Sequence, residues 1–197
     1  MSLILCSEAQ AKDLGVVGQT FPVVEPDLLA VIHQRLEAME KSGAIARQQE
    51  ELKRRTLAFV ERPSPVPGIG RTVRAATWLY DPTVTLDMDL RGVDGQVFHH
   101  KGERINPLDY RPFTRTLIFV DGDDPKQMEW ALALDRRKGG ATKIIFVKGA
   151  VIDWQKRLKR PLYFDQHGVL VRKFGIAHVP ATVAQEGRML RVSEVTP

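Results

Sequence analysis

The stretch Lys173-Phe-Gly-Ile-Ala-His-Val-Pro-Ala-Thr-Val-Ala-Gln-Glu-Gly-Arg-Met-Leu190 decides the fold class of this chain. Helix-forming residues end at Gly175, a residue suited to a helix C-terminus. Pro180 precedes a predicted strand, where its missing N–H need not join the ladder of hydrogen bonds. Gly187 predicts a hairpin turn, and the alternation from Met189 to Val195 predicts the returning strand.

A strand, a helix and a second strand precede this stretch. Leu117–Val120 is rich in β-branched and aromatic residues, which indicates a buried strand. Asp123 or Asp124 is expected to cap a helix that Pro125 opens. Strand, helix and strand of this length imply a right-handed parallel crossover, and the whole segment is therefore α/β. The later elements expected are a strand over Lys143–Val147, a short helix over Val151–Lys159 and a strand over Leu162–Phe164.

This combination resembles the end of a thioredoxin-like domain, here expected over residues 116–197. In thioredoxins the equivalent proline is cis and faces a CxxC pair, so the resemblance implies a cis Val179–Pro180 bond. A trans proline opening an edge strand is the alternative. Pro180, Val179 and His178 would then be structural or recognition residues. The segment Asp123-Asp-Pro-Lys126 lies where a CxxC would be, a degenerate redox-motif position formed by Asp123, Asp124, Pro125 and Lys126.

Disulfide exchange through a pair of cysteines is excluded, because the chain has a single cysteine, Cys6. Leu3-Ile-Leu5 and Ala9-Gln-Ala11 resemble the end of a secretory signal peptide, although the apolar run is too short for an intact one. Either translation starts further upstream or the small residues are a coincidence. We expect residues 1–11 to be a signal peptide remnant, which leaves a mature chain without cysteine.

Length and composition indicate one compact domain with an appended arm, since 197 residues with 43% hydrophobic content can bury a core. The 29 basic and 24 acidic residues give a net charge of +5, which weakly permits contact with nucleic acid or an anionic membrane. No window approaches the roughly 20 apolar residues of a transmembrane helix. We therefore expect a soluble or peripheral protein.

Residues 12–62 are predicted to form an N-terminal helical arm. Leu29, Ile32, Leu36 and Met39 recur at the spacing of a coiled-coil seam, and Gly43 interrupts the pattern. So narrow a stripe cannot fold alone, so it must pack on the body or on another chain. Pairing with a partner is the sharper hypothesis, and it makes these four residues the partner-binding arm.

Two further regions are expected between the arm and the α/β segment. Residues 63–70 contain three prolines and two glycines, which predicts a stiff extended linker. Residues 71–115 are predicted to form a β-hairpin region. In it Val84–Leu90 alternates apolar and polar residues as a half-buried strand does, and the partner strand begins at Gln96 after a turn.

Few residues suggest chemistry. Asp121, Asp123 and Asp124 follow a buried strand and could gather Mg²⁺ or Ca²⁺, although an acidic helix cap is the favoured explanation. His99 and His100 are adjacent on a strand and point to opposite faces, so they do not form a joint metal site. No catalytic residue, cofactor-binding residue, metal ligand or cofactor is predicted. Two basic clusters, Arg136–Lys138 and Lys156–Arg160, are either a phosphate-binding patch or a solvated face. The side chains of Trp130 and Trp154 are expected in the core.

Several motifs, taken together and in this order, resemble the TraW family of F-type conjugative transfer. They are Leu14-Gly-Val-Val-Gly-Gln-Thr-Phe-Pro-Val-Val-Glu-Pro-Asp-Leu-Leu29, Tyr80-Asp-Pro82, Asn106-Pro-Leu-Asp109, Phe119-Val-Asp-Gly-Asp-Asp124 with Trp130-Ala131, and Tyr163-Phe-Asp-Gln-His-Gly168. The resemblance implies a periplasmic component of a type IV secretion system that acts in pilus assembly. It also implies TrbC-like and other periplasmic conjugation proteins as partners, and it transfers no catalytic residues.

The expected function is therefore non-catalytic and depends on protein–protein interactions. No small-molecule substrate is expected, and nucleic acid is not the favoured partner. The alternative is a chaperone-like protein or a metal-dependent enzyme of the periplasm that uses the cluster of Asp121, Asp123 and Asp124.

Overall fold

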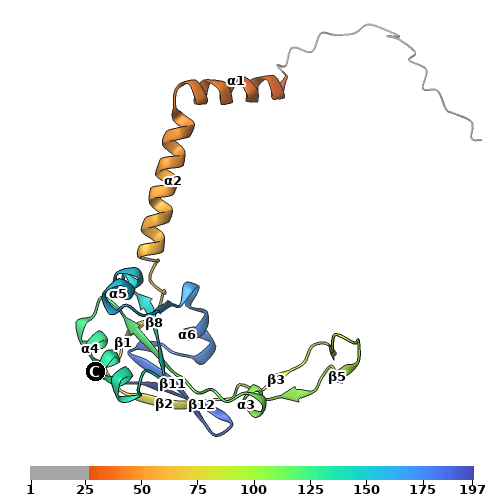
Figure 1. Cartoon of the computed structure of the whole chain (residues 1–197), viewed down its shortest axis with the longest axis vertical. Helices are drawn as coiled ribbons and strands as arrows, with labels where there is room; N and C mark the ends of the chain where they lie inside the picture. The colour runs from red at the N-terminus through yellow and green to blue at the C-terminus, as the bar shows by residue number, and fades with distance from the viewer. Residues whose placement is uncertain (1–26) are drawn as a thin grey trace, which may run out of the picture. The chain divides into compact units, whose positions relative to one another are not determined.

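The computed structural model describes residues 27–197, so Cys6 and the signal peptide remnant lie outside the described residues. The chain separates into two compact units, residues 1–51 and residues 52–197. The division falls within a helix rather than at the proline-rich segment where the sequence suggested a linker. Figure 1 shows the elements of both units.

Two helices account for the described arm. Helix α1 spans Leu28–Lys41, and its N-terminus is capped by the Asp27 side chain, which accepts a hydrogen bond of 2.9 Å from the backbone N–H of Leu29. Gly43 has φ +68, a left-handed conformation that glycine adopts without steric cost. Helix α2 spans Ala44–Glu61. Within the described residues the two helices lie where the sequence predicted a helical arm, and the chain breaks between them at Gly43.

A six-stranded sheet forms the centre of the second unit, in the order β2-β12-β11-β7-β8-β9. Strand β7 is parallel to β8, which is parallel to β9, whereas β11 is antiparallel to β7 and to β12, and β12 is antiparallel to β2. The fold is therefore mixed α/β, as the sequence predicted. The strands are β2 (Ala76–Tyr80), β7 (Thr116–Asp121), β8 (Thr142–Lys148), β9 (Tyr163–Phe164), β11 (Ala181–Glu186) and β12 (Met189–Glu194).

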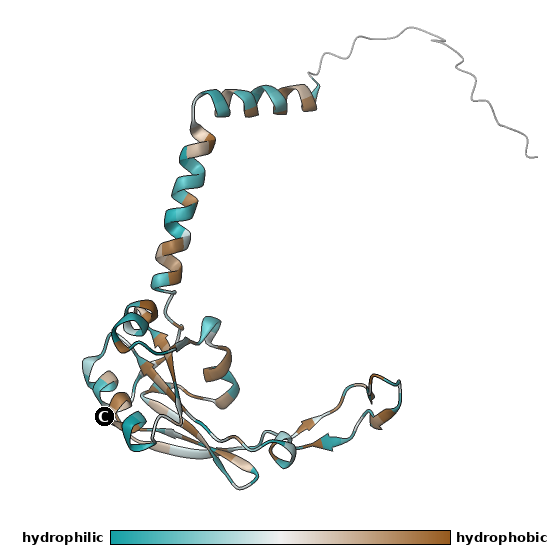
Figure 2. Cartoon of the chain, viewed as in Figure 1, coloured by the Kyte–Doolittle hydropathy of each residue, from teal (hydrophilic) through white to brown (hydrophobic). Residues whose placement is uncertain are grey.

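Helices cover both faces of this sheet. Helices α4 (Pro125–Arg137) and α5 (Val151–Leu158) pack over Ile118, Val120 and Phe146 on one face. Helix α6 (Val169–Phe174), preceded by a 3₁₀ turn over Gln166–Gly168, packs over the other face. Buried strands with both faces covered are hydrophobic almost throughout, as Figure 2 shows for the middle of the sheet.

The elements predicted after residue 116 agree with the structure to within about two residues. Asp124 is the N-cap of α4, with its side chain accepting hydrogen bonds from the backbone N–H groups of Lys126 and Gln127. The parallel crossover, the antiparallel hairpin and the turn at Gly187, which has φ +60, are all present.

The hairpin region departs from its prediction. It forms two short antiparallel pairs, β3 (Val84–Thr85) with β6 (Arg104–Ile105) and β4 (Leu90–Arg91) with β5 (Val97–His99), where a continuous strand was expected. Val84 and Met88 are exposed rather than half-buried. A two-stranded ribbon has no third layer on which to bury an apolar face, which explains the difference.

Two elements near this region had no counterpart in the prediction. Strand β2 forms one edge of the main sheet, and its Trp78 indole N–H donates a hydrogen bond of 3.0 Å to the carbonyl of Phe174. After Asn106 the chain forms a short helix, α3 (Pro107–Tyr110), which the Asn106 side chain caps by accepting a hydrogen bond from the N–H of Leu108. Strand β2 depends on pairing with β12, which is far away in the sequence, and α3 depends on its local cap.

The proline-rich segment also differs from the expected linker, because part of it is packed into the body. Val66 is buried in the core on the α6 face, and its backbone N–H donates a hydrogen bond of 2.8 Å to the carbonyl of Val147. The segment ends in strand β1 (Gly70–Arg71). It therefore belongs to the second unit.

Candidate functional site

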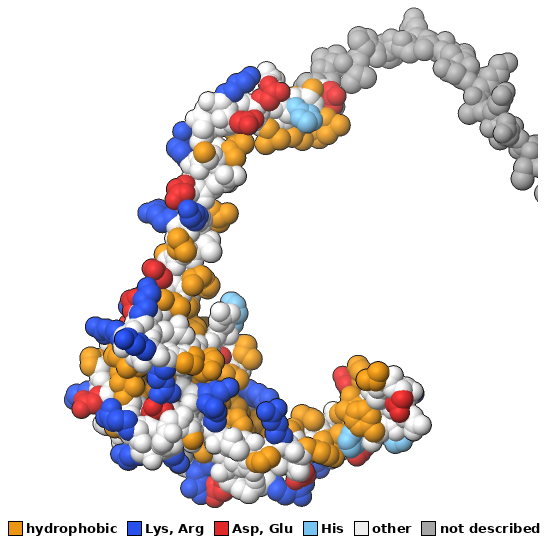
Figure 3. Space-filling model, viewed as in Figure 1, with side chains coloured by type: hydrophobic (Ala, Val, Ile, Leu, Met, Phe, Trp, Pro, Cys, Tyr) orange, Lys and Arg blue, Asp and Glu red, His pale blue; other side chains and the backbone are white. Residues whose placement is uncertain are grey.

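The first candidate site is the apolar stripe of α1, formed by Leu29, Ile32, Leu36 and Met39. All four side chains are exposed, and no residue of α1 is buried. Figure 3 shows hydrophobic side chains along one side of this helix and charged ones along the other. Lys41 and Glu37 of the same helix form an ion pair of 3.7 Å. The stripe predicted from the sequence is therefore present and leaves an apolar surface available for contact.

The second candidate site surrounds Pro180. The Val179–Pro180 bond is cis, as the thioredoxin resemblance implied. The two residues before the proline form strand β10 (His178–Val179), which pairs in parallel with β1. Backbone hydrogen bonds join Gly70 N–H to the Ala177 carbonyl at 2.9 Å and Thr72 N–H to the Val179 carbonyl at 2.8 Å.

Glu194, on strand β12, binds the segment at positions 177–180, which is called the proline loop below. This buried carboxylate accepts hydrogen bonds from the backbone N–H groups of Ala177 at 2.7 Å and His178 at 2.8 Å. It also lies 2.9 Å from Nδ1 of the His178 ring. The sequence analysis missed Glu194, although an acid at an inward position of the alternating segment Leu190, Val192, Glu194 is a usable signal.

The chain's own β1 thus occupies the backbone positions beside the proline. A partner strand that used the same hydrogen-bonding groups of β10 would have to displace Gly70 and Arg71. The roles of Pro180, Val179 and His178 in recognition therefore stay a prediction, with displacement of β1 as an added condition.

The third candidate is the carboxylate cluster between β7 and α4, and each of its members has a cationic partner. Asp121 accepts a hydrogen bond of 3.1 Å from Lys148. The guanidinium of Arg62 contacts both oxygens of Asp123, at 2.9 and 3.1 Å. Arg71 lies 3.4 Å from Asp124.

These contacts set the charge of the cluster. The hydrogen bond from Lys148 to Asp121 raises the pKa of the lysine ammonium above its ordinary value. Burial acts to raise the pKa of Asp124, but hydrogen bonds from the Gln127 and Lys126 N–H groups outweigh it, and the pKa is lowered overall. No group of three potential ligands suited to a metal ion occurs among residues 27–197. The geometry supports a helix cap within an ion-pair network.

Arg71 connects this cluster to the proline loop. Its backbone pairs with Val179 through β1 and β10, while its side chain reaches Asp124. The two positions that the sequence associated with a lost redox site are therefore close to each other in the structure. Arg62 and Arg71 carry no motif, so sequence reasoning had no signal by which to find them.

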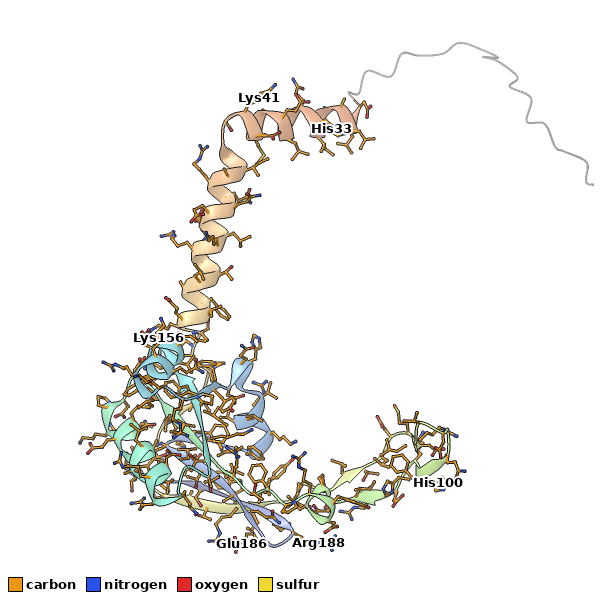
Figure 4. All side chains as sticks on the ribbon, in the orientation of Figure 1. His33, Lys41, His100, Lys156, Glu186 and Arg188 are labelled. Carbon is orange, nitrogen blue, oxygen red and sulfur yellow. The ribbon has the colours of Figure 1, made fainter. Side chains whose placement is uncertain are left out.

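The remaining predicted residues are separate from these sites. His99 Nδ1 lies 3.0 Å from Glu103, and Figure 4 places His100 in the hairpin. Trp130 packs against the core as expected. Trp154 packs there too, but it also lines a surface groove beside Arg136 and Arg157, which belong to the two predicted basic clusters.

Comparison with known proteins places the chain in a family. Residues 1–23 match the family model described as the sex factor F TraW protein N terminal. Protein TraW of Escherichia coli (strain K12) is 45% identical over 185 residues, which cover 92% of this chain and 86% of that protein. The chain belongs to the TraW family. No solved structure matches it.

Membership in the TraW family confirms the resemblance found in the sequence motifs. Because the match covers nearly the whole chain, it includes most of both compact units. Among the helices within residues 27–197, none combines the length and apolar character needed to cross a bilayer.

Proposed function

We propose that this chain is a non-catalytic periplasmic component of an F-type conjugative type IV secretion system and acts in pilus assembly by binding other proteins. Membership in the TraW family supports the link to conjugation. The observation that carries the proposal is the stripe of exposed apolar side chains along α1. Four such side chains on one helix face form a seam suited to a partner helix.

We also propose that the second unit is a thioredoxin-type domain that has lost its CxxC pair. Parallel strands β7 and β8, the antiparallel hairpin of β11 and β12, and a cis proline just before β11 support this assignment. Asp123 to Lys126 then stands at the degenerate redox position, where ion pairs replace thiol chemistry. Such a domain would serve as a scaffold.

The partner is proposed to be a TrbC-like protein. Deletion of residues 27–51 removes α1 and the part of α2 that precedes Leu52, and it stops at the boundary of the second unit, which keeps Phe59 and Arg62 in the body. Co-purification of a TrbC-like protein from periplasmic extract is expected to fall to background with this variant, while the melting temperature of the body stays unchanged. Undiminished co-purification would contradict the assigned role of the arm.

Point variants test whether the apolar side chains of the stripe, rather than the helix as a whole, bind the partner. Replacing Leu29, Ile32, Leu36 and Met39 by glutamine keeps good helix propensity and removes the apolar seam. The matched control replaces Glu37 and Lys41 by glutamine on the charged side of the same helix. We expect loss of the partner with the first variant and retention with the second. Equal loss with both would argue for a different contact surface.

The alternative function, a metal-dependent enzyme, has less support because Lys148, Arg62 and Arg71 already contact the three carboxylates. Thermal unfolding with and without Mg²⁺ or Ca²⁺ tests it. A rise in melting temperature that the combined Asp123→Ala and Asp124→Ala substitutions abolish would favour the metal site over the scaffold.

A further inference from the structure

A groove runs between α4 and α5 on the surface of the second unit. It encloses about 420 Å³, and one face of α4 supplies most of its lining. Positions 125, 128, 129, 132 and 136 recur at helical spacing, so the groove follows α4 for about 16 Å. The lining residues are Gly122, Pro125, Met128, Glu129, Leu132, Arg136, Trp154 and Arg157.

The floor of the groove is apolar and is part of the hydrophobic core. Met128 is fully buried and belongs to the core on this face of the sheet, against which Leu132 and Trp154 also pack. The indole N–H of Trp154 donates a hydrogen bond of 3.0 Å to the Gly122 carbonyl, which fixes the ring at the groove wall. A fixed aromatic wall over a buried floor is typical of pockets that receive an apolar side chain.

The rim of the groove is cationic. The guanidinium carbon of Arg157 lies 5.2 Å from the centre of the Trp154 ring. Within residues 27–197 neither Arg136 nor Arg157 forms an ion pair with a carboxylate. Glu129 is the single acid in the lining. Lys156, labelled in Figure 4, adds positive charge on α5.

The two units carry net charges of opposite sign, and the unit that contains the groove is the positively charged one. Residues 52–197 contain 25 Lys and Arg against 16 Asp and Glu, whereas residues 1–51 contain 4 against 8. The surface around the groove therefore attracts negatively charged partners over a distance of about one Debye length.

We infer that this groove binds an acidic amphipathic helix of another protein. The groove lies between two helices and contains no sheet edge, so side chains rather than paired strands must supply the contacts. Apolar residues of the bound helix contact Leu132 and Trp154 above the buried Met128, and its carboxylates pair with Arg136 and Arg157. This surface is distinct from the apolar stripe of α1 and does not depend on it.

Binding of two synthetic peptides to the full chain tests the inference. Both peptides are 15-residue helices, on the order of four turns, with leucine on one face. The first has glutamate on the polar face and the second has lysine there. We expect the acidic peptide to bind, to change the fluorescence of Trp154 and to weaken as salt rises. The Trp154→Phe substitution should remove the fluorescence change.

Charge-reversal variants locate the contact. Arg136→Glu combined with Arg157→Glu is expected to weaken binding of the acidic peptide by about tenfold or more. The matched control, Arg115→Glu combined with Lys173→Glu, reverses two exposed charges outside the groove lining and should change binding by less than about twofold.

Several results would overturn the inference. One is the absence of binding by the acidic peptide at low salt, and another is an equal loss of affinity in the control variant, which would indicate diffuse attraction. Stronger binding of a single-stranded oligonucleotide, lost on reversal of Arg136 and Arg157, would assign the groove to nucleic acid instead.

Discussion

Helix α1 and strand β7 are both rich in apolar residues, yet only one of them is covered. Leu29 of α1 is 67% exposed and Leu36 is 49% exposed, whereas Ile118 and Phe119 of β7 are 0% exposed. The local sequence pattern identifies an apolar surface in both cases. It does not determine whether the same chain supplies the other half of the contact.

The difference shows how the two regions depend on their surroundings. Strand β7 is stabilised by neighbouring strands on both sides and by packing on both faces, so its burial contributes to the free energy of unfolding of the body. Helix α1 has no buried residue, so its apolar side chains contribute little until a partner covers them. Mutations in the two regions should therefore affect different measurements.

The largest expected effect comes from the core. Phe119→Ala removes a fully buried ring that packs edge-on against Phe174 with ring centres 6.4 Å apart. It should lower the free energy of unfolding of the body by about 3–5 kcal/mol, since a cavity remains. Urea denaturation followed by tryptophan fluorescence measures the loss. A loss below about 1 kcal/mol would contradict the assigned core.

A buried acid gives the next largest effect and a pH dependence. Burial acts to raise the pKa of Asp135, but hydrogen bonds from Arg160 and Thr142 outweigh it and the folded pKa is lowered. The stability contributed by a lowered pKa is present above the unfolded value of about 3.9 and is lost as pH falls through the folded value.

Asp135→Asn should therefore lower the free energy of unfolding at pH 7 by about 1–3 kcal/mol. The variant should also lose less stability than the parent protein as the pH falls below about 4. Denaturation curves at pH 7 and pH 3 check both effects. Parallel pH profiles for the two proteins would show that Asp135 is not the titrating group.

Two helix caps test whether the body and the arm contribute differently to the free energy of unfolding. Asp124 caps α4 in the body, and Asp27 caps α1 in the arm. Asp124→Ala should lower the free energy of unfolding of the body by about 1 kcal/mol, because α4 packs on the sheet. Asp27→Ala should reduce helicity measured by circular dichroism and leave the unfolding of the body unchanged. Equal effects on the body would show that the arm and the body unfold together.

The smallest effect is expected on the stripe. Leu36→Ala should change the free energy of unfolding of the body by less than about 0.5 kcal/mol, because the side chain is exposed and lies in the other unit. The same substitution should weaken partner capture. A large change in body stability would mean that α1 packs against the second unit in solution.

The sequence was most informative where local rules act alone. The sequence predicted that Asp123 or Asp124 caps α4, and the structure selects Asp124. Gly187 between alternating segments predicted the hairpin of β11 and β12. The stripe of α1 was likewise predicted from spacing. Around the proline, the sequence singled out Pro180, Val179 and His178 but not their contacts, and their role in recognition stays a prediction.

The missed residues share a physical cause. Arg71 and Glu194 act on the proline loop from positions distant in the sequence, one through a parallel strand pair and the other through three hydrogen bonds. Val66 is buried in a core cluster whose other buried members all lie at position 117 or beyond. Such long-range pairing depends on the packing of the whole body, so no local pattern reports it.

The sequence by itself determined the mixed α/β class, the helical arm with its apolar stripe, and the absence of a cysteine pair. Each of these follows from composition or from the periodicity of residues close together in the chain. The tertiary structure decided that β1 lies beside the cis proline, that Arg62, Arg71 and Lys148 neutralise the carboxylates, and that Trp154 lines a cationic groove. These features arise where packing brings distant side chains within contact, and local propensities carry no information about that arrangement.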